Sequence, residues 1–181
     1  MPVQGKTIAF LTSPEGIEQA ELTGPWQAVE EAGGRPVLLA TSGDKVQAYN
    51  HLDAADSFPV DRLVADADPG DYAALVLPGG VANGDALRAD EGAQRFVKAF
   101  LDAGKPVATI CHAPWILVEV DGLRGRTMTS WPTLQTDLRN AGATWVDREV
   151  VVDTSGAGPL ITSRKPDDVP AFSRELIAAV R

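Results

Sequence analysis

Short apolar runs alternate with amphipathic stretches along most of the chain. The runs predict buried strands, because nearly every position in them is hydrophobic and none shows a strict in–out alternation. The stretches between them carry apolar residues at helical spacing, and several end at a glycine, which is typical of a helix C-terminus. The predicted strands are 7–11, 36–40, 73–77 and 106–110, with a shorter one at 127–129 and a closing pair at 149–152 and 160–162. The predicted helices are 17–32, 91–103, 133–141 and 167–180.

Two stretches depart from this alternation. Gly24 and Pro25 interrupt the first helix, so it is either kinked there or has its regular part only from Pro25 onward. Residues 45–71 are polar and irregular, and they predict short edge strands or a hairpin. Apolar strands separated by helices predict an α/β fold with a mostly parallel sheet and helices on both faces. With no repeat or linker in the sequence, we expect a single domain over residues 1–181.

Composition narrows the class of protein. A formal net charge of -9 disfavours nucleic acid and anionic membranes as main partners. The chain has one cysteine, so no disulfide can form within it, and this favours a reducing compartment. No segment approaches the roughly 20 apolar residues of a membrane-spanning helix, and the first six residues do not form a secretory signal. We therefore expect a cytoplasmic protein.

The single cysteine is the strongest candidate for chemistry. Cys111 ends the predicted strand 106–110 and is followed by His112, one of two histidines in the chain. At a strand-to-helix turn, a thiol sits near a helix N-terminus and beside an imidazole, and a helix N-terminus or a neighbouring cation lowers the pKa that controls its nucleophilicity. The alternative is a small buried cysteine with no reaction to perform, since free cysteines are among the most buried residues.

Three features fall at the same sheet edge as Cys111, because the carboxyl ends of parallel strands meet there. Glu18 follows the first strand, and Gly79 and Gly80 follow the strand 73–77. The backbone N–H groups of Gly79, Gly80 and His112 are candidates for an oxyanion hole, in which amide donors bind the negative oxygen of a reacting carbonyl. Gly79 and Gly80 alone would indicate only a turn. Their coincidence with Cys111 favours a reactive site.

Four segments resemble the PfpI family, which comprises the PfpI-type intracellular peptidases and general stress proteins of the parkinsonism-associated deglycase superfamily. They are 77–80, 104–112, 147–153 and 161–172. The resemblance covers nearly the whole chain. It implies a flavodoxin-like three-layer sandwich of the class I glutamine amidotransferase-like type and a cysteine at a strained elbow. Through the motif 17–21, it also implies that Glu18 is the glutamate facing the elbow, and Glu21 is interpreted as a solvated or helix-starting residue.

The resemblance assigns roles around the thiol. A carboxyl held beside a thiolate is disfavoured as an anion, so a protonated Glu18 would donate a hydrogen bond to the sulfur of Cys111. In peptidase-like members, an acidic residue of a neighbouring subunit orients the histidine. Asp85 occupies that position for His112, although one extra residue separates it from Gly80. The alternative is that Asp85 caps the following helix.

Remaining candidates line the site or lie outside it. Trp115 and Trp131 are predicted to wall the substrate pocket, although tryptophan is also common in cores and interfaces. His51 is interpreted as a surface residue, and Asp53 and Asp56 beside it do not complete a metal site. We expect neither a metal nor a cofactor. The chain has no glycine-rich nucleotide-binding turn after its first strand.

Three functions remain open from the sequence. The first is a cysteine-dependent hydrolase or lyase acting on small reactive carbonyls or carbonyl-modified proteins, like a deglycase or glyoxalase. The second is an intracellular peptidase that uses Cys111, His112 and Asp85. The third is a non-catalytic stress protein whose Cys111 is oxidised to a sulfinate. Glutamine amidotransferase activity is disfavoured, because no histidine follows His112. The resemblance also implies a homodimer or a higher homo-oligomer.

Overall fold

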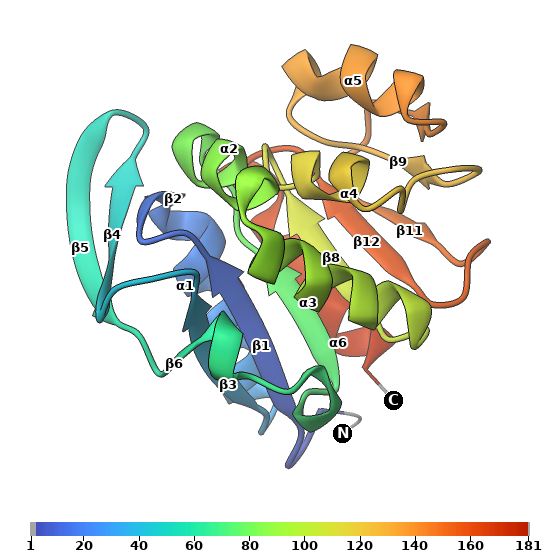
Figure 1. The fold of residues 1–181 in the computed structure, drawn as a ribbon. Coiled ribbons are helices and arrows are strands. Elements are labelled where there is room, and N and C mark those ends of the chain that lie inside the picture. Colours follow the sequence, from blue (N-terminus) through green and yellow to red (C-terminus); the bar gives the residue numbers. More distant parts are fainter. Residues whose placement is uncertain (1–2, 181) are drawn as a thin grey trace.

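All of the predicted strands except 127–129 assemble into one seven-stranded sheet between two layers of helices, and the seventh strand of that sheet, β6, comes from the segment predicted as irregular (Figure 1). The computed structural model describes residues 3–180. Six of the strands run parallel, and only the edge strand β11 is antiparallel to its neighbour. This confirms the predicted parallel sheet with helices on both faces. From edge to edge, the strands are β11 (Val151–Asp153), β12 (Leu160–Ser163), β8 (Val107–Ile110), β7 (Ala74–Leu77), β1 (Thr7–Thr12), β3 (Arg35–Ala40) and β6 (Arg62–Leu63).

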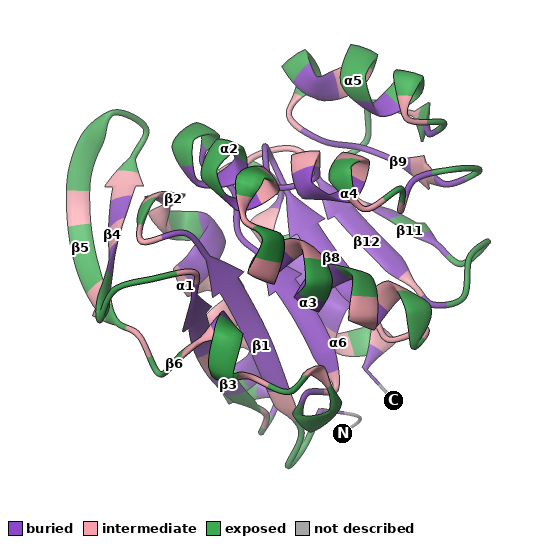
Figure 2. Cartoon of the chain, in the orientation of Figure 1, coloured by how far each residue is buried: buried purple, intermediate pink, exposed green. Residues whose placement is uncertain are grey.

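Successive residues of the central strands pack into different helix layers, because their side chains alternate across the sheet. In β1, Ile8 and Phe10 join the core beneath one pair of helices, whereas Ala9 and Leu11 join the core of the opposite face. The strands are therefore buried on both sides (Figure 2). Helices α1 (Gln19–Glu31) and α6 (Val169–Ala179) cover one face, and α2 (Val81–Ala89), α3 (Glu91–Asp102) and α4 (Trp115–Glu119) cover the other.

Two smaller sheets flank the main one. A short parallel pair is formed by β9 (Thr127–Met128) and β10 (Thr144–Trp145), and α5 (Gln135–Asn140) lies between them in the chain. The second small sheet contains β2 (Glu15–Glu18), β4 (Lys45–Asn50) and β5 (Asp53–Pro59). Single-turn 3-10 helices are found at Val64–Asp66, Pro69–Asp71, Pro132–Leu134 and Pro166–Asp168.

The hairpin predicted within 45–71 is present and reaches the carboxyl edge of the main sheet. Strands β4 and β5 pair antiparallel, and β2 runs parallel to β4 with Glu18 opposite Tyr49. Since β2 follows β1 directly, this pairing places the hairpin tip, residues 51–52, near the end of β1 (Figure 1). The tip of this polar segment therefore lies beside the region of the sheet edge where Cys111 was expected.

The first helix begins later than the sequence predicted. Residues 15–18 are extended as β2, and Glu18 is the N-cap residue of α1, which begins at Gln19. The helix then continues through Pro25, so neither a start at Pro25 nor a break there is observed. This two-residue shift determines which glutamate faces the cysteine.

A helix that the sequence did not predict, α2, follows Gly80. Its composition favours a loop, because Gly84 lies inside it and glycine is about 1 kcal/mol less favourable than alanine in a helix. A Cβ atom at Gly84 would lie 2.6 Å from the carbonyl oxygen of His112. Glycine is therefore required for α2 to pack directly on the turn after Cys111.

None of the helices within residues 3–180 has the length and apolar character that crossing a bilayer requires.

Candidate active site

Cys111 occupies a sharp, strained turn between β8 and the segment that leads into α4. Its φ angle is 64°, in the left-handed region that a residue with a Cβ atom rarely adopts. Two backbone hydrogen bonds hold this conformation: the Cys111 N–H donates to the Ser163 carbonyl at 3.1 Å, and the Cys111 carbonyl accepts from Trp131 N–H at 2.9 Å. The predicted elbow is thus present, and neighbouring strand ends hold it in place.

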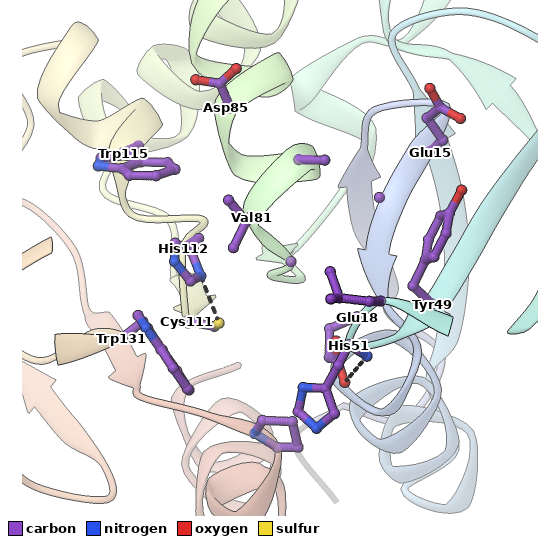
Figure 3. Close-up of a pocket in the computed structure, with 15 residues that line it drawn as sticks. Glu15, Glu18, Tyr49, His51, Val81, Asp85, Cys111, His112, Trp115 and Trp131 are labelled. Atoms are coloured by element: carbon purple, nitrogen blue, oxygen red, sulfur yellow. Dashed lines mark hydrogen bonds between the residues drawn. The ribbon is translucent and has the colours of Figure 1, made fainter. Parts of the chain in front are cut away.

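The elbow opens into a cavity of about 700 Å³ at the carboxyl edge of the sheet (Figure 3). Cys111 lies at one end of the cavity and is 6% exposed. His112, Trp115 and Trp131 line one side, which is where the two tryptophans were predicted to lie. The other side comes from β2 and the hairpin tip, and its lining residues are Glu15, Gly16, Glu18, Tyr49, His51 and Leu52.

The carboxyl group beside the thiol belongs to Glu21. Glu21 is fully buried, and its carboxyl lies against Gly79 and the Cys111 side chain. A Cβ atom at Gly79 would meet the Glu21 carboxyl and would come within 2.6 Å of the Cys111 Cβ atom. Gly79 is therefore the residue that allows the carboxyl and the thiol to approach each other. Within residues 3–180, neither Glu21 oxygen has a hydrogen-bond partner of standard geometry.

Burial raises the pKa of Glu21 well above the usual carboxyl range, and the negative charge of Glu18 raises it further. The Cys111 thiol and the Gly79 amide oppose this shift without reversing it. A carboxyl this deeply buried and without a cation beside it is protonated at neutral pH. The interpretation of Glu21 as a solvated residue is therefore wrong, whereas its place in the first turn of α1 agrees with the helix-starting alternative.

Glu18 lies in the cavity wall, away from the position predicted for it. Its carboxylate accepts a hydrogen bond from the backbone N–H of His51 at 3.1 Å (Figure 3). Because Glu18 is still in extended backbone at the end of β2, its side chain points toward the hairpin. The prediction that Glu18 bonds the sulfur of Cys111 is corrected: Glu21, three residues later and one helical turn away, occupies that place.

The sequence contained a signal for Glu21. The buried residues of α1 are Glu21, Leu22, Pro25 and Val29, which share one helical face at spacings of one, four and eight residues. A glutamate within such an apolar stripe is a candidate for a buried acid. By spacing alone Glu18 also falls on this stripe, four residues before Leu22 and seven before Pro25, and only the start of the helix at Gln19 removes it.

The environment of the Cys111 sulfur contains opposing influences. Burial raises the pKa of the Cys111 thiol above its ordinary value, and the negative charge of an ionised Glu21 raises it further; the backbone amides of Gly80 and His112 oppose this rise without reversing it. Those two amides belong to the predicted oxyanion hole. The third, that of Gly79, is directed toward the Glu21 carboxyl and thus helps to hold the acid rather than the substrate.

His112 packs between aromatic rings. Its ring stacks on Trp131 with centroids 5.7 Å apart and tilts against Trp115 at 5.2 Å. Its Nδ1 atom lies 3.1 Å from the Cys111 sulfur. Burial lowers the pKa of His112 to about 4, so the imidazole is neutral at physiological pH. The site therefore does not hold an imidazolium–thiolate pair.

We expect His112 to stay neutral at every pH above about 4. The ordinary pKa of this group, which applies to the unfolded chain, is 6.5. Between pH 6.5 and 4 the unfolded state therefore binds more protons than the folded state. The contribution of His112 to folding stability is thus complete above pH 6.5 and is lost as the pH falls through this window. NMR titration of the ring, assigned with His112→Asn, measures its pKa directly. The free energy of unfolding of the two proteins should diverge only in that window, and a ring that titrates near 6.5 would contradict the expectation.

Asp85 does not contact His112 within the described part of the chain. It lies inside α2, is exposed, and lines the cavity rim (Figure 3). The only polar side-chain partner of the imidazole within residues 3–180 is the Cys111 sulfur. Asp85 also does not cap the following helix, as the alternative interpretation held: Asp90 is the N-cap of α3 and accepts a hydrogen bond from Ala93 N–H at 2.7 Å.

The model of the DJ-1/PfpI family matches residues 6–179. The chain belongs to the DJ-1/PfpI family. It is 38% identical over 172 residues to protein/nucleic acid deglycase 2 of Escherichia coli, covering 95% of this chain and 96% of that one. It is 39% identical over 174 residues to general stress protein 18 of Bacillus subtilis, with 96% and 97% covered. Among solved structures, it is similar to a two-domain protein from Anabaena variabilis that contains DJ-1/ThiJ/PfpI-like and ferritin-like domains. The TM-score is 0.87 at 32% identity, and the match covers 96% of this chain and 47% of that chain.

In this DJ-1/PfpI protein, Asn83 fixes the turn that supplies the amide donors. Its buried side chain donates to the carbonyls of Pro78 and Gly79 at 2.8 and 3.1 Å, and it accepts from the Ser13 N–H at 2.8 Å. It thus ties the end of β7 to the end of β1. Sequence reasoning missed Asn83, because nothing in the segment 81–85 predicted a helix that would turn this side chain inward.

His51 is a second residue whose place sequence reasoning missed. It was interpreted as an isolated surface histidine, but it lies at the hairpin tip and lines the cavity of this DJ-1/PfpI site. Its φ angle is 58°, and Glu18 accepts its backbone N–H. The parallel pairing of β2 with β4 brings it there, and no local pattern around residue 51 encodes that pairing.

Proposed function

We propose that this protein is a cysteine-dependent enzyme that acts on reactive carbonyls or on their adducts with proteins, as a deglycase or glyoxalase does. The observation that carries the proposal is the buried Glu21 carboxyl beside the Cys111 thiol. The name of the Escherichia coli relative describes a deglycase, and that of the Bacillus subtilis relative a general stress protein. Both names agree with a site built to handle reactive carbonyl compounds.

Glu21 and Cys111 act as one titrating pair. An ionised Glu21 raises the pKa of the thiol by repulsion, but a protonated Glu21 removes that repulsion and donates a hydrogen bond to the thiolate, and the amides of Gly80 and His112 stabilise that anion further. The nucleophile is therefore activated by a neutral acid rather than by a charged histidine. This arrangement suits an aldehyde, which accepts a thiolate readily and needs a proton on its oxygen at the same moment.

The reaction with methylglyoxal illustrates the roles. The thiolate of Cys111 adds to the aldehyde carbon, and the carbonyl oxygen takes the proton held by Glu21, giving a hemithioacetal. Because this carbon is now bonded to sulfur, the carboxylate beside the sulfur is also close to the carbon and can remove its proton. Returning that proton to the neighbouring carbon, while the hydroxyl proton passes from the oxygen of the first carbon to the oxygen of the second, gives a lactate thioester. Water then releases lactate and restores the thiol, so that methylglyoxal and water together yield lactic acid.

The amide donors supply charge stabilisation. During addition and thioester hydrolysis, negative charge develops on the substrate oxygen, and the N–H groups of Gly80 and His112 lie beside the reacting sulfur. The strained φ angle of Cys111 keeps the sulfur in line with them. Neutral His112, with its Nδ1 atom 3.1 Å from the sulfur, contributes a hydrogen bond and an aromatic wall rather than a charge.

A peptidase is the second candidate, and the short distance between the His112 Nδ1 atom and the sulfur favours it. Such an enzyme needs a histidine that accepts and returns a proton near neutral pH, together with an acid that orients the ring. The low pKa of His112 and its lack of contact with Asp85 in the described chain weigh against this function. If a neighbouring subunit supplied the acid that orients His112, this argument against a peptidase would no longer apply.

Asp85→Asn separates these functions. We expect the purified variant to consume methylglyoxal and release lactate within about twofold of the wild-type kcat/KM, because the proposed steps use no acid at position 85. Hydrolysis of an unfolded peptide, measured in the same preparations, should be negligible for both proteins. Strong peptide hydrolysis that disappears in Asp85→Asn would favour the peptidase. If neither substrate turns over and mild peroxide converts Cys111 to a stable sulfinate, the proposal fails and a redox sensor remains.

A further inference from the structure

The charged side chains that line the active-site cavity all carry the same sign. Glu15 and Glu18 project from β2, and Asp85 projects from α2 across the opening (Figure 3). No lysine or arginine is among the lining residues of the described chain. His112 is neutral at physiological pH. A ligand entering this cavity thus passes three carboxylates without meeting a fixed positive charge.

Basic residues next to lining residues do not offset this charge, because Arg88 beside Trp115, and Arg164 and Lys165 just before Pro166, are each paired with carboxylates. Arg88 lies over the outer face of Trp115, and its Nε atom donates to Glu119 at 2.8 Å. Arg164 donates to Asp147 at 2.7 Å and to Asp168 at 2.9 Å. Each guanidinium is paired with at least one carboxylate and contributes little net field to the cavity.

The remaining lining of the cavity is apolar and aromatic. Tyr49, Trp115 and Trp131 line its sides, and Leu52 at the hairpin tip is 95% exposed. Glu21 is not among the lining residues, but its fully buried carboxyl lies against the side chain of the lining residue Cys111. Apolar walls with acidic groups around them suit a ligand that has an aliphatic or aromatic body and a positive charge, as a modified basic side chain has.

We infer that Glu15, Glu18 and Asp85 are specificity-determining residues that select carbonyl adducts bearing positive charge and disfavour adducts carried by anions. The inference rests on the proposed function only in taking the ligand to be a carbonyl adduct. The selection by charge is a property of the cavity itself. It predicts that a hemithioacetal of an anionic thiol is a poorer substrate than the hemithioacetal of a neutral or cationic thiol of similar size.

The charge selection is testable without turnover, through reagents that differ mainly in charge. Methanethiosulfonates form a mixed disulfide with a thiolate and release methanesulfinate, so the rate of labelling at Cys111 reports the local concentration of the reagent. The probes are the cationic trimethylammonioethyl and the anionic sulfonatoethyl methanethiosulfonate. Each rate is divided by the rate with a free small thiol at the same pH and ionic strength. We expect the normalised cation-to-anion ratio of the wild-type protein to exceed about tenfold at low salt.

Removing the carboxylates, one alone or all together, should lower the normalised cation-to-anion ratio. We expect Glu15→Gln to reduce it about threefold and the triple variant Glu15→Gln/Glu18→Gln/Asp85→Asn to bring it close to that of the free thiol. The glutamine at position 18 retains an oxygen acceptor for the His51 N–H, so the hairpin stays in place. Glu31→Gln is the matched control, because it removes one exposed charge at the far end of α1, outside the cavity lining, and should leave the ratio unchanged.

The outcomes separate this inference from the proposed function. A wild-type ratio near that of the free thiol, or an equal decrease in Glu31→Gln, overturns the charge selection even if methylglyoxal turns over. Failure of both reagents to label Cys111 also overturns it, because a cavity that selects cationic ligands must admit them. A high ratio that collapses in the triple variant supports the charge selection even if the protein lacks carbonyl activity, in which case only the proposed function fails.

Discussion

Replacing Cys111 by serine is expected to abolish the conversion of methylglyoxal to lactate, with a loss of kcat/KM on the order of 10⁴-fold or more. Cys111 is the only cysteine in the chain, so no second thiol can replace it. A serine hydroxyl at the same elbow would be held by the same amides, but its pKa is far above that of a thiol. The Glu21 carboxyl beside it cannot keep an alkoxide ionised in a buried site.

The measurement is lactate release from methylglyoxal, followed alongside the midpoint of chemical unfolding. Serine is close to cysteine in size, and the backbone hydrogen bonds of residue 111 to Ser163 and Trp131 do not involve the side chain. We therefore expect the unfolding midpoint to change little while activity disappears. Residual activity above about one per cent in Cys111→Ser would show that the thiol is not the nucleophile.

Replacing Glu21 by glutamine is expected to reduce kcat/KM for methylglyoxal by about 10²- to 10³-fold, which is the usual contribution of a positioned acid–base group. A glutamine amide still donates a hydrogen bond to the sulfur, but it cannot give up and recover a proton during turnover. The thiolate should thus remain reactive toward iodoacetamide while carbonyl turnover is lost. This separation of alkylation from turnover is specific to a proton shuttle.

Glu18→Gln is the matched control for Glu21→Gln. The two glutamates are three residues apart, but Glu18 bonds the His51 backbone, and only Glu21 lies beside the sulfur. We expect Glu18→Gln to retain turnover of methylglyoxal within about threefold of wild type. The comparison is made by steady-state kinetics on the two variants, with circular dichroism to check folding. Equal losses in both variants, or a larger loss in Glu18→Gln, would contradict the assignment of the proton shuttle to Glu21.

The strands of the main sheet could be predicted because their burial is encoded locally. Every residue of 74–77 and 107–110 is buried, and a run of this kind is visible in the sequence without knowledge of its partners. Helix α2 could not be predicted in this way. Gly84 weakens any local helical preference, and the packing against the His112 carbonyl that makes glycine necessary involves residues far along the chain.

The residues of the candidate site could likewise be predicted only in part. Cys111 and Gly80 could be placed together, because the carboxyl ends of adjacent parallel strands must meet at one edge. The identity of the acid could not be decided in the same way. It depends on whether residues 17–18 belong to the helix, and their extended conformation follows from pairing with β4, which begins 27 residues later at Lys45.

The sequence by itself determined the family, the parallel sheet with helices on both faces, and the position of a lone cysteine at a strand end, because motifs and runs of buried residues are properties of short segments. The tertiary structure alone decided that Glu21 rather than Glu18 meets the sulfur, that His112 is neutral, and that the cavity is acidic. The physical reason is the same for all three. The ionisation of a group depends on which segments exclude water from it and which charges they bring, and those segments are distant in sequence.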